Sequence, residues 1–445
     1  MTKRRISWCA PFRGADVAAQ IAHPLNGLRA TLDSIHPPPL KFNFVEQRQP
    51  AEESGMALTA DIQLRDRACW ISATLRRHGL AAAVVAGPDN VGYLSGFYHP
   101  DLRYVPKRLH IVVWPAQGAP IFVVPAPRAL NWVGQGDKTY VGPEDGTASI
   151  ADVRPYDGEG IAGARTVIDV LQELGIDRGS LGIEGNHLPE GFAAELQRSI
   201  PNLQLVDASE CLDEIVTAKE DADIQAVVSI NRVTTQTLEQ ELTLARPGES
   251  ERDVSARIVR RLWEHGATEL VHGILAVGPR AAGWHALPSA TKLAEGQLIR
   301  TDWGVRCERG FASDIARNVV VGKASPRQKD IFARISDAHD TVVEAVRPGA
   351  LASELAQLAR RRYDQLGLEF RWGIVGHGIG RTVQEAPLLW PDVHEPVKEG
   401  QTLQIELGYF GKTEVYHIED LIHVRANGAV NLTQLSPRVL LQSTW

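Results

Sequence analysis

The chain has 445 residues, 44% of them hydrophobic, which is ordinary for a globular protein and long enough for two or more domains, because single cores rarely exceed about 250–300 residues. The formal net charge of −7 is mild for this length, and no basic run is interleaved with aromatic residues, so composition gives no support to nucleic-acid binding. No run of about 18 apolar residues predicts a membrane span.

The N-terminal segment, residues 1–57, carries few periodic apolar positions and contains three consecutive prolines at 37–39. We therefore expect an irregular extension there. It begins with basic residues but lacks a long apolar run, which argues against a secretion signal. The four cysteines lie far apart, without metal or redox spacing, and this predicts reduced thiols in a cytoplasmic protein.

Helical and strand-like segments alternate from residue 58 to about residue 217. The pattern predicts a first helix over 61–78, stopped by Gly79, and a turn at 87–90. The remaining elements expected in this region are helices near 162–174 and 189–199 and strands over 80–85, 109–114, 120–124, 181–184 and 203–206. Such alternation is typical of an α/β domain.

A weak internal repeat marks the rest of the chain, residues 218–445. One helix ends at an Arg-Pro-Gly triplet at 246–248, another ends at the same triplet at 347–349, and a further helix begins shortly after each. Ser250 and Asp253 have the spacing of a capping box, and Ser325 before Pro326 is typical of the start of a helix over 326–346. Each half therefore reads as helix, Arg-Pro-Gly, helix, strands.

Five charged or imidazole side chains stand in apolar or glycine-rich, strand-like contexts in the last third of the chain. Buried charges are costly unless they are paired or bind a metal ion. Four carboxylates and one imidazole suit a pair of divalent ions, because a carboxylate can bridge two ions. The five residues are Asp302, Asp314, His377, Glu406 and Glu419.

These residues and their flanks resemble the metal site of the pita-bread metallohydrolases of peptidase family M24, such as aminopeptidase P, prolidase and methionine aminopeptidase. The order Asp, Asp, His, Glu, Glu matches, as do Gly-His-Gly-Ile-Gly-Arg at 376–381 and Ile-Glu-Asp at 418–420. The segment 89–97 resembles the creatinase-type N-terminal domain. The resemblance implies an α+β protein, with a creatinase-like α/β domain over 58–217 and a pita-bread catalytic domain of pseudo-twofold duplication over 218–445.

The resemblance also implies the chemistry: a dinuclear-metal-dependent hydrolase that cleaves a C–N bond in an Xaa-Pro-like peptide or a small amide. Manganese is the preferred ion, with cobalt, zinc or iron compatible. Glu406 would take the proton from a metal-bridging water. His285, seventeen residues before Asp302, matches the family histidine that contacts substrate, beside Trp284. The tryptophans Trp284, Trp303, Trp372 and Trp390 are candidates to wall the pocket.

This chain departs from the family pattern at three points. Asp302 and Asp314 are twelve residues apart where the family has eleven, which we assign to one extra residue in the turn between them. Gln384 stands where aminopeptidases and prolidases carry a second histidine, and His417 stands where aminopeptidase P has arginine. Glutamine can donate a hydrogen bond but cannot shuttle a proton, so we expect weak turnover of Xaa-Pro peptides and a better, smaller substrate.

Alternatives remain open at this point. A metal-dependent lyase acting on a small zwitterion, similar to dimethylsulfoniopropionate lyase, and a ring-opening amidohydrolase similar to ectoine hydrolase both use this fold, whereas binding scaffolds in the family usually lose metal ligands. Relatives commonly dimerise, and the loop 97–104 matches a creatinase segment that reaches the neighbouring subunit. We therefore expect a homodimer in which Arg103 or Arg108 binds an anionic group of a small peptide or small molecule.

Overall fold

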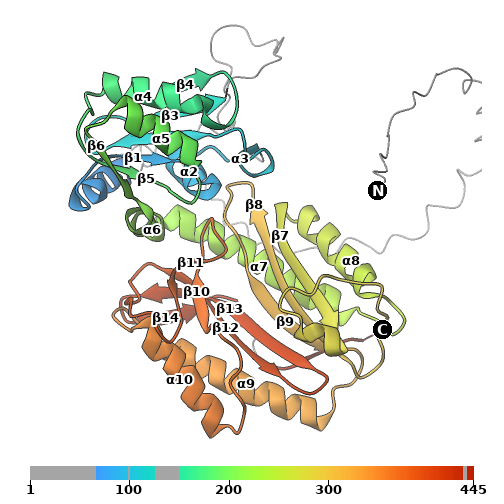
Figure 1. The fold of residues 1–445 in the computed structure, drawn as a ribbon. Coiled ribbons are helices and arrows are strands. Elements are labelled where there is room, and N and C mark those ends of the chain that lie inside the picture. The colour runs from blue at the N-terminus through green and yellow to red at the C-terminus, as the bar shows by residue number, and fades with distance from the viewer. Residues whose placement is uncertain (1–66, 99–100, 126–149, 434–437, 445) are drawn as a thin grey trace, which may run out of the picture. The chain divides into compact units, whose positions relative to one another are not determined.

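The computed structural model describes residues 67–98, 101–125, 150–433 and 438–444 (Figure 1). The predicted N-terminal extension lies outside the described residues. Among the residues described, no helix combines the length and the apolar character that crossing a membrane requires.

The first domain is built on a six-stranded mixed sheet with the strand order β4-β3-β2-β1-β5-β6 (Figure 1). Strand β1 is central: it pairs antiparallel with β2 and parallel with β5. Its alternate side chains belong to two separate buried clusters, with Ala83 and Val85 in one and Ala82 and Val84 in the other. The sheet is therefore buried on both faces, as expected for the predicted α/β domain.

The elements of this domain follow the predicted order closely. A helix covers residues 67–77 and ends just before Gly79, which has a positive φ of 69°. The other elements are β1 (Leu80–Val85), α2 (Pro88–Ser95), α3 (Asp101–Tyr104), β2 (Ile111–Pro115), β3 (Ile121–Pro125), β4 (Asp152–Tyr156), η1 (Gly160–Ala162), α4 (Gly163–Glu173), β5 (Gly179–Ile183), α5 (Glu190–Ser199), β6 (Leu203–Asp207) and α6 (Ser209–Thr217).

The predicted turn at 87–90 is wrong, because helix α2 begins there. Gly87 is the residue before its first turn and Pro88 occupies the first helical position, where the missing N–H of proline costs nothing. The same Gly-Pro-Asp-Asn residues suit a turn and a helix start. Strand β4 and helices α3 and α6 were not predicted.

The second domain contains two sheets, with the strand orders β11-β10-β12-β13-β14 and β15-β9-β8-β7. Helices α7 and α8 pack on the second of these sheets, and α9 and α10 pack on the first (Figure 1). The elements are α7 (Asp221–Thr243), α8 (Glu251–Glu264), β7 (Ala267–Val277), η2 (Gly278–Ala282), β8 (Leu298–Cys307), β9 (Ile315–Val320), α9 (Pro326–Ala345), α10 (Ala352–Gln365), β10 (Gly376–Gly378), β11 (Glu385–Leu388), β12 (Thr402–Phe410), β13 (Val415–Arg425), β14 (Gly428–Asn431) and β15 (Leu441–Gln442).

The internal repeat is visible in the backbone. Gly248 and Gly349, the last residues of the two Arg-Pro-Gly triplets, share a φ of 87°, which favours glycine. Gly248 donates to the carbonyl of Leu293 at 2.9 Å, and Gly349 donates to that of Val397 at 2.8 Å. Complete capping boxes begin α8 at Ser250 and α9 at Ser325. Two similar helix–helix–strand units therefore form this domain.

Strands β9 and β13 join the two sheets. Arg317 of β9 donates to the backbone carbonyl of Glu419 at 2.6 Å, and the backbone N–H of His417 donates to Asn318 Oδ1 at 2.7 Å. The carboxylates of both halves are thereby brought to one place.

Candidate metal centre

The first half of the second domain contributes Asp302 and Asp314. Asp302 lies inside β8, opposite Ile274 of β7 and Ala316 of β9, and Asp314 directly precedes β9. The turn between them contains Gly310, whose φ is 78° and whose N–H donates to Cys307 at 2.8 Å. The twelve-residue spacing is accommodated by this hairpin.

The second half contributes His377, Glu406 and Glu419. Glu406 of β12 and Glu419 of β13 are directly opposite each other in the ladder, so their side chains emerge on the same face. His377 lies on β10, between β11 and β12. All three are buried.

The two glycines that flank His377 allow β10 to lie closely between its neighbours. A Cβ at Gly376 would come within 2.2 Å of the carbonyl oxygen of Gln404, and a Cβ at Gly378 within 2.4 Å of that of Ala386. Their main physical role is this close strand packing, which holds the imidazole in position.

The carboxylates of Asp314, Glu406 and Glu419 converge on His377. Asp314 Oδ2 lies 3.7 Å from His377 Nε2, and the same nitrogen lies 3.7 Å from Glu406 Oε1 and 3.9 Å from Glu419 Oε1. Among the described residues, Asp314 Oδ1 and Glu419 Oε1 are buried acceptors without a hydrogen-bond partner. Such oxygens are costly unless a ligand occupies the space between them, and carboxylates with an imidazole suit divalent metal ions. The residues present therefore fit a metal centre.

The crowding of carboxylates perturbs their acidity. Burial and the Asp302 carboxylate raise the pKa of Asp314 to about 6, against the opposing effect of His272. Burial, with the carboxylates of Asp314, Glu406 and Asp302, raises the pKa of Glu419 well above its usual value. Burial alone would raise the pKa of Asp302 as well, but the neighbouring His272 holds it below its usual range. Bound cations would relieve this repulsion.

Glu406 is oriented by two neighbours. Its Oε2 accepts a hydrogen bond from Trp372 Nε1 at 3.3 Å and lies 3.0 Å from His417 Nε2, which donates because a carboxylate oxygen can only accept. The rings of Trp372 and His417 are 4.4 Å apart, and Trp372 lies over Gly408, where a Cβ would come within 2.1 Å of the ring. The predicted residue His417 thus contacts one of the five metal-ligand candidates.

Three other predicted site residues lie at the surface of the protein. His285, Trp284 and Gln384 are exposed. The loop that carries His285 is held by Arg300, which donates to the carbonyls of Ala281, Gly283 and Trp284, and the rings of Trp284 and Trp372 are 5.0 Å apart.

The remaining tryptophans and the two arginines have other surroundings. Trp303 is buried against Gly273, whereas Trp390 is exposed. Arg103 pairs with Asp89 of its own chain, and Arg108 is half exposed, 3.7 Å from Glu159. Neither arginine contacts the five metal-ligand candidates.

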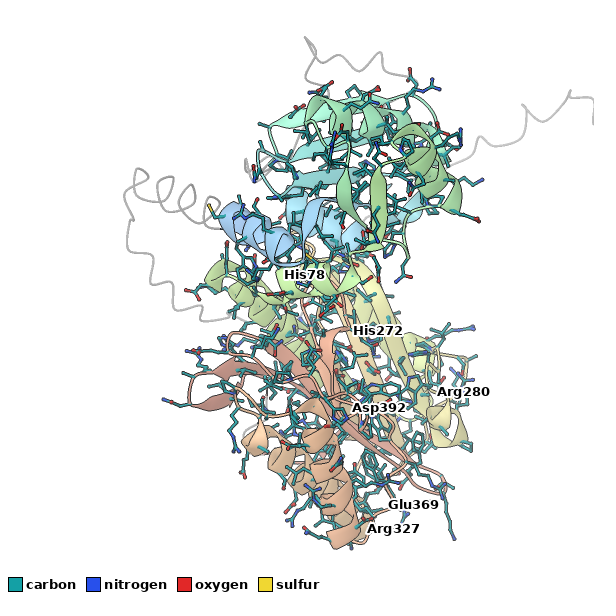
Figure 2. The ribbon with its side chains drawn as sticks, turned by 60° about the vertical axis from the view of Figure 1, so that its left-hand side comes forward. His78, His272, Arg280, Arg327, Glu369 and Asp392 are labelled. Carbon is teal, nitrogen blue, oxygen red and sulfur yellow. The ribbon has the colours of Figure 1, made fainter. Side chains whose placement is uncertain are left out.

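One histidine that the sequence did not predict as part of the site is His272, which lies on β7 (Figure 2). Its Nε2 is 2.9 Å from Asp302 Oδ1 and 3.0 Å from Asp314 Oδ1. Burial alone would lower the pKa of His272, but the carboxylates of Asp314 and Asp302 raise it well above its usual value. The sequence does contain a pattern that could have identified His272: an imidazole inside the apolar run 270–277. A polar side chain in an apolar run is also the pattern that identified Asp302.

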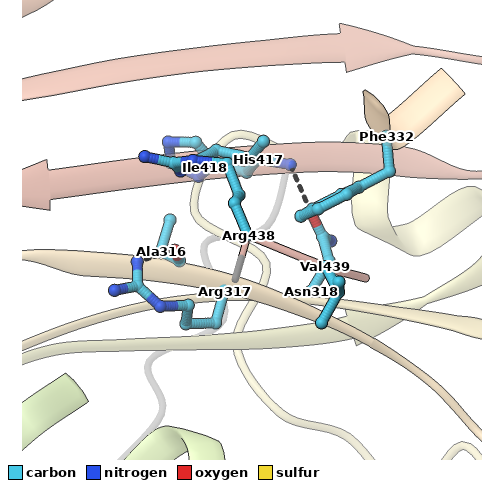
Figure 3. A pocket seen from close by; sticks show the side chains of 8 residues that line it. All are labelled: Ala316, Arg317, Asn318, Phe332, His417, Ile418, Arg438 and Val439. Atoms are coloured by element: carbon cyan, nitrogen blue, oxygen red, sulfur yellow. Dashed lines mark hydrogen bonds between the residues drawn. The ribbon is translucent and has the colours of Figure 1, made fainter. Parts of the chain in front are cut away.

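A cavity of about 10 Å³ lies between β9, β13 and the segment that carries Arg438 (Figure 3). It is lined by Arg317 and Asn318 of β9, His417 and Ile418 of β13, and Arg438. The arginines thus support the strand that carries Glu419.

Known proteins share both parts of the chain. Residues 225–426 match the model for metallopeptidase family M24, and residues 71–215 match the model for the creatinase/prolidase N-terminal domain. These segments fall inside the two predicted domains.

Two curated relatives illustrate the similarity in sequence. The Xaa-Pro dipeptidase of Pyrococcus horikoshii is 29% identical over 57% of this chain and 73% of its own length. The putative dipeptidase YkvY of Bacillus subtilis is 26% identical over 82% of this chain and 96% of its own length. These names do not favour the lyase or ring-opening alternatives.

Solved structures share the fold. Dipeptidase PepE from Mycobacterium ulcerans aligns with a TM-score of 0.71 at 25% identity, over 85% of this chain and 97% of its own. A recombinant prolidase from Thermococcus sibiricus aligns with a TM-score of 0.72 at 23% identity, over 86% of this chain and 99% of its own.

Proposed function

Since the chain belongs to metallopeptidase family M24 and is an enzyme of the aminopeptidase P/prolidase type, we propose that it is a dipeptidase for Xaa-Pro substrates that works at a centre of two divalent metal ions. The observation that carries the proposal is the position of Asp314. Its Oδ1 faces Asp302 and His272, and its Oδ2 faces His377. One carboxylate with an oxygen toward each of two ligand groups is suited to bridge two ions.

The proposed ligands are Asp302, Asp314, His377, Glu406 and Glu419. When bound, the ions would lower the pKa of a shared water and polarise the scissile carbonyl. Glu406 is the proposed proton acceptor: Trp372 and His417 hold its Oε2, so its Oε1 faces the centre, where it would take a proton from the water and deliver it to the leaving amine.

Three exposed residues are proposed to hold the peptide. His285 would contact the peptide backbone and Trp284 would pack against a substrate side chain, while Gln384 would donate a neutral hydrogen bond to the reacting carbonyl oxygen. Arg300 supports the first two indirectly, because it anchors the backbone of their loop.

The test is elemental analysis of purified protein together with assays on Xaa-Pro dipeptides, longer peptides and small amides. Asp314→Ala should lose at least one ion and nearly all activity. Asp177→Ala is the matched control, since Asp177 is an exposed acid of the first domain. If Asp314→Ala retained the full metal content of the wild type, the ligand assignment would be wrong.

Manganese as the ion, a homodimer and a cytoplasmic location are further proposals. Cys69, Cys211 and Cys307 are free thiols in the described part of the chain, which supports a reducing compartment. Loading with manganese, cobalt, zinc or iron in turn, and comparing the resulting activities, tests the choice of ion.

For the homodimer, Arg108 is the better candidate to reach a substrate carboxylate, because Arg103 already pairs with Asp89. Arg108→Ala should raise KM for a dipeptide while leaving KM for its amide unchanged. A monomer in light scattering would contradict this arrangement. So would a variant whose KM for the dipeptide and KM for the amide are both the same as in the wild type.

A further inference from the structure

A glycine in β8 leaves room for the imidazole of His272 beside the two aspartates. His272 lies opposite Gly304 in the β7–β8 ladder. A Cβ at Gly304 would come within 2.5 Å of His272 Cε1, so only glycine leaves room for the ring to cross β8. The absence of a side chain at 304 thus lets His272 Nε2 reach Asp302 and Asp314.

The spacing of the three atoms is that of ligands around one ion. His272 Nε2 lies 2.9 Å from Asp302 Oδ1 and 3.0 Å from Asp314 Oδ1. Nitrogen and oxygen ligands that bind a divalent ion at about 2.0–2.2 Å, at right angles to each other, are separated by roughly 3 Å. The Nε2 atom therefore stands where a ligand would stand.

A second observation points to a ligand in the same place. Asp314 is buried, and its Oδ1, the oxygen nearest His272, has no hydrogen-bond partner among the described residues. The single N–H that His272 Nε2 can carry is directed at Asp302 Oδ1, so its approach does not satisfy Asp314 Oδ1, whereas an ion between them would bind both atoms.

We propose that His272 is a sixth protein ligand, which binds the metal ion held by Asp302 and Asp314. This inference rests on the proposed function, since it presumes that these aspartates bind metal. The centre then has two imidazoles, with His272 at one ion and His377 at the other. Asp314, whose Oδ1 faces His272 and whose Oδ2 faces His377, would lie between them.

The sixth ligand would change which ions the enzyme prefers. Carboxylate oxygens suit manganese, while imidazole suits zinc, iron and related ions. The ion bound by His272 should therefore favour zinc or cobalt over manganese more strongly than a site made of oxygen ligands alone. His272 also lines a cavity of about 440 Å³ with Trp303 and Leu287, so the ring is accessible from that side.

The experiment uses the full chain loaded with two equivalents of Co²⁺. X-ray absorption should give one imidazole per cobalt on average in the wild type and half that value in His272→Gln. Calorimetry should show one of the two sites weakened by at least about 10–100-fold in the variant, with the loss larger for Zn²⁺ than for Mn²⁺. His187→Gln is the control, because His187 is a half-exposed histidine of the first domain.

A second measurement gives a positive signal. Proton NMR of the Co²⁺-loaded protein should show hyperfine-shifted ring N–H signals from two imidazoles in the wild type and from one in His272→Gln. If His272→Gln matches His187→Gln in imidazole number, in both affinities and in these signals, His272 only forms ion pairs with the aspartates and the inference fails. If the wild type binds no ion, the proposed function itself fails, so the two failures are distinguishable.

Discussion

Replacing Asp420 by asparagine should destabilise the fold by about 3 kcal/mol, although Asp420 is not a proposed metal ligand. Asp420 is fully buried beside Glu419. Its Oδ1 lies 3.0 Å from Arg317 Nη2, and its Oδ2 lies 2.6 Å from Arg438 Nη2. It also accepts hydrogen bonds from Asn431 and Thr433. Asparagine preserves the size of the side chain and removes its charge.

The magnitude follows from what the two arginines retain. Breaking a buried ion pair by removing one partner costs about 3–5 kcal/mol. Arg438 keeps Asp340 at 3.1 Å, and Arg317 keeps three backbone carbonyl acceptors, so the low end of the range applies. Asp340→Asn removes the other, partly exposed acid from Arg438 and should cost at most about 1 kcal/mol.

The stabilisation that Asp420 provides should depend on pH in a defined direction. Burial opposes ionisation, but Arg317 and Arg438 outweigh it and hold the pKa of Asp420 below its usual range. The stabilisation is therefore fully present above the unfolded-state pKa of about 3.9 and is lost as the pH falls. The difference between wild type and Asp420→Asn should stay constant from pH 7 to pH 5 and shrink below about pH 4.

The assay is urea unfolding of chelator-treated protein, because removing metal separates this effect from any change at Glu419. A difference at pH 7 no larger than that of Asp340→Asn, or one that grows on acidification, would refute the reasoning.

Three further predictions test the site. Because burial raises the pKa values of Asp314 and Glu419, metal binding should release protons, and the affinity for metal should increase between pH 5 and pH 7. Calorimetry in buffers of different ionisation enthalpy measures the protons released; no proton release and an affinity that does not change with pH would contradict this. Gly378→Ala should lower the free energy of unfolding by about 1–3 kcal/mol. Gly185→Ala should change it little, because a Cβ at position 185 would meet open space. Equal unfolding midpoints for the two variants would contradict the strand-packing role of Gly378. Gln384→His should raise kcat/KM for an Xaa-Pro dipeptide by about 10²-fold or more, and an unchanged value would remove Gln384 from the reaction.

The sequence predicted those features that depend on local pattern. The run 80–85 is apolar throughout and became β1 with the predicted bounds. The Arg-Pro-Gly triplets located the duplication, because glycine at the third position permits the positive φ seen in both copies. The five metal-ligand candidates were found because an ionised side chain in an apolar run requires a partner.

Features that depend on strand register could not be predicted in the same way. His272 reaches the aspartates only because it lies opposite Gly304, and the β7–β8 register shifts between Leu270 and His272. The hydrogen bond from Trp372 to Glu406 joins residues 34 positions apart. No periodicity in the sequence specifies either contact.

The two histidines beside carboxylates, His272 and His417, should have different roles. His417 Nε2 lies on Glu406 Oε2, whereas His377 faces Glu406 Oε1, so His417 orients the carboxylate from the side opposite the other ligands. His272 Nε2 instead lies 2.9 Å from Asp302 Oδ1 and 3.0 Å from Asp314 Oδ1. These are the separations expected of atoms that bind one ion.

His417→Gln should therefore keep both metal ions and the full number of imidazole ligands. The neutral amide can still donate to Glu406 but holds it less well, so kcat should fall by about 10–100-fold. His272→Gln should instead lower the imidazole number. Metal analysis and X-ray absorption on the two variants, measured side by side, test the contrast. If His417→Gln loses an ion or an imidazole while His272→Gln loses neither, the two roles have been assigned to the wrong residues.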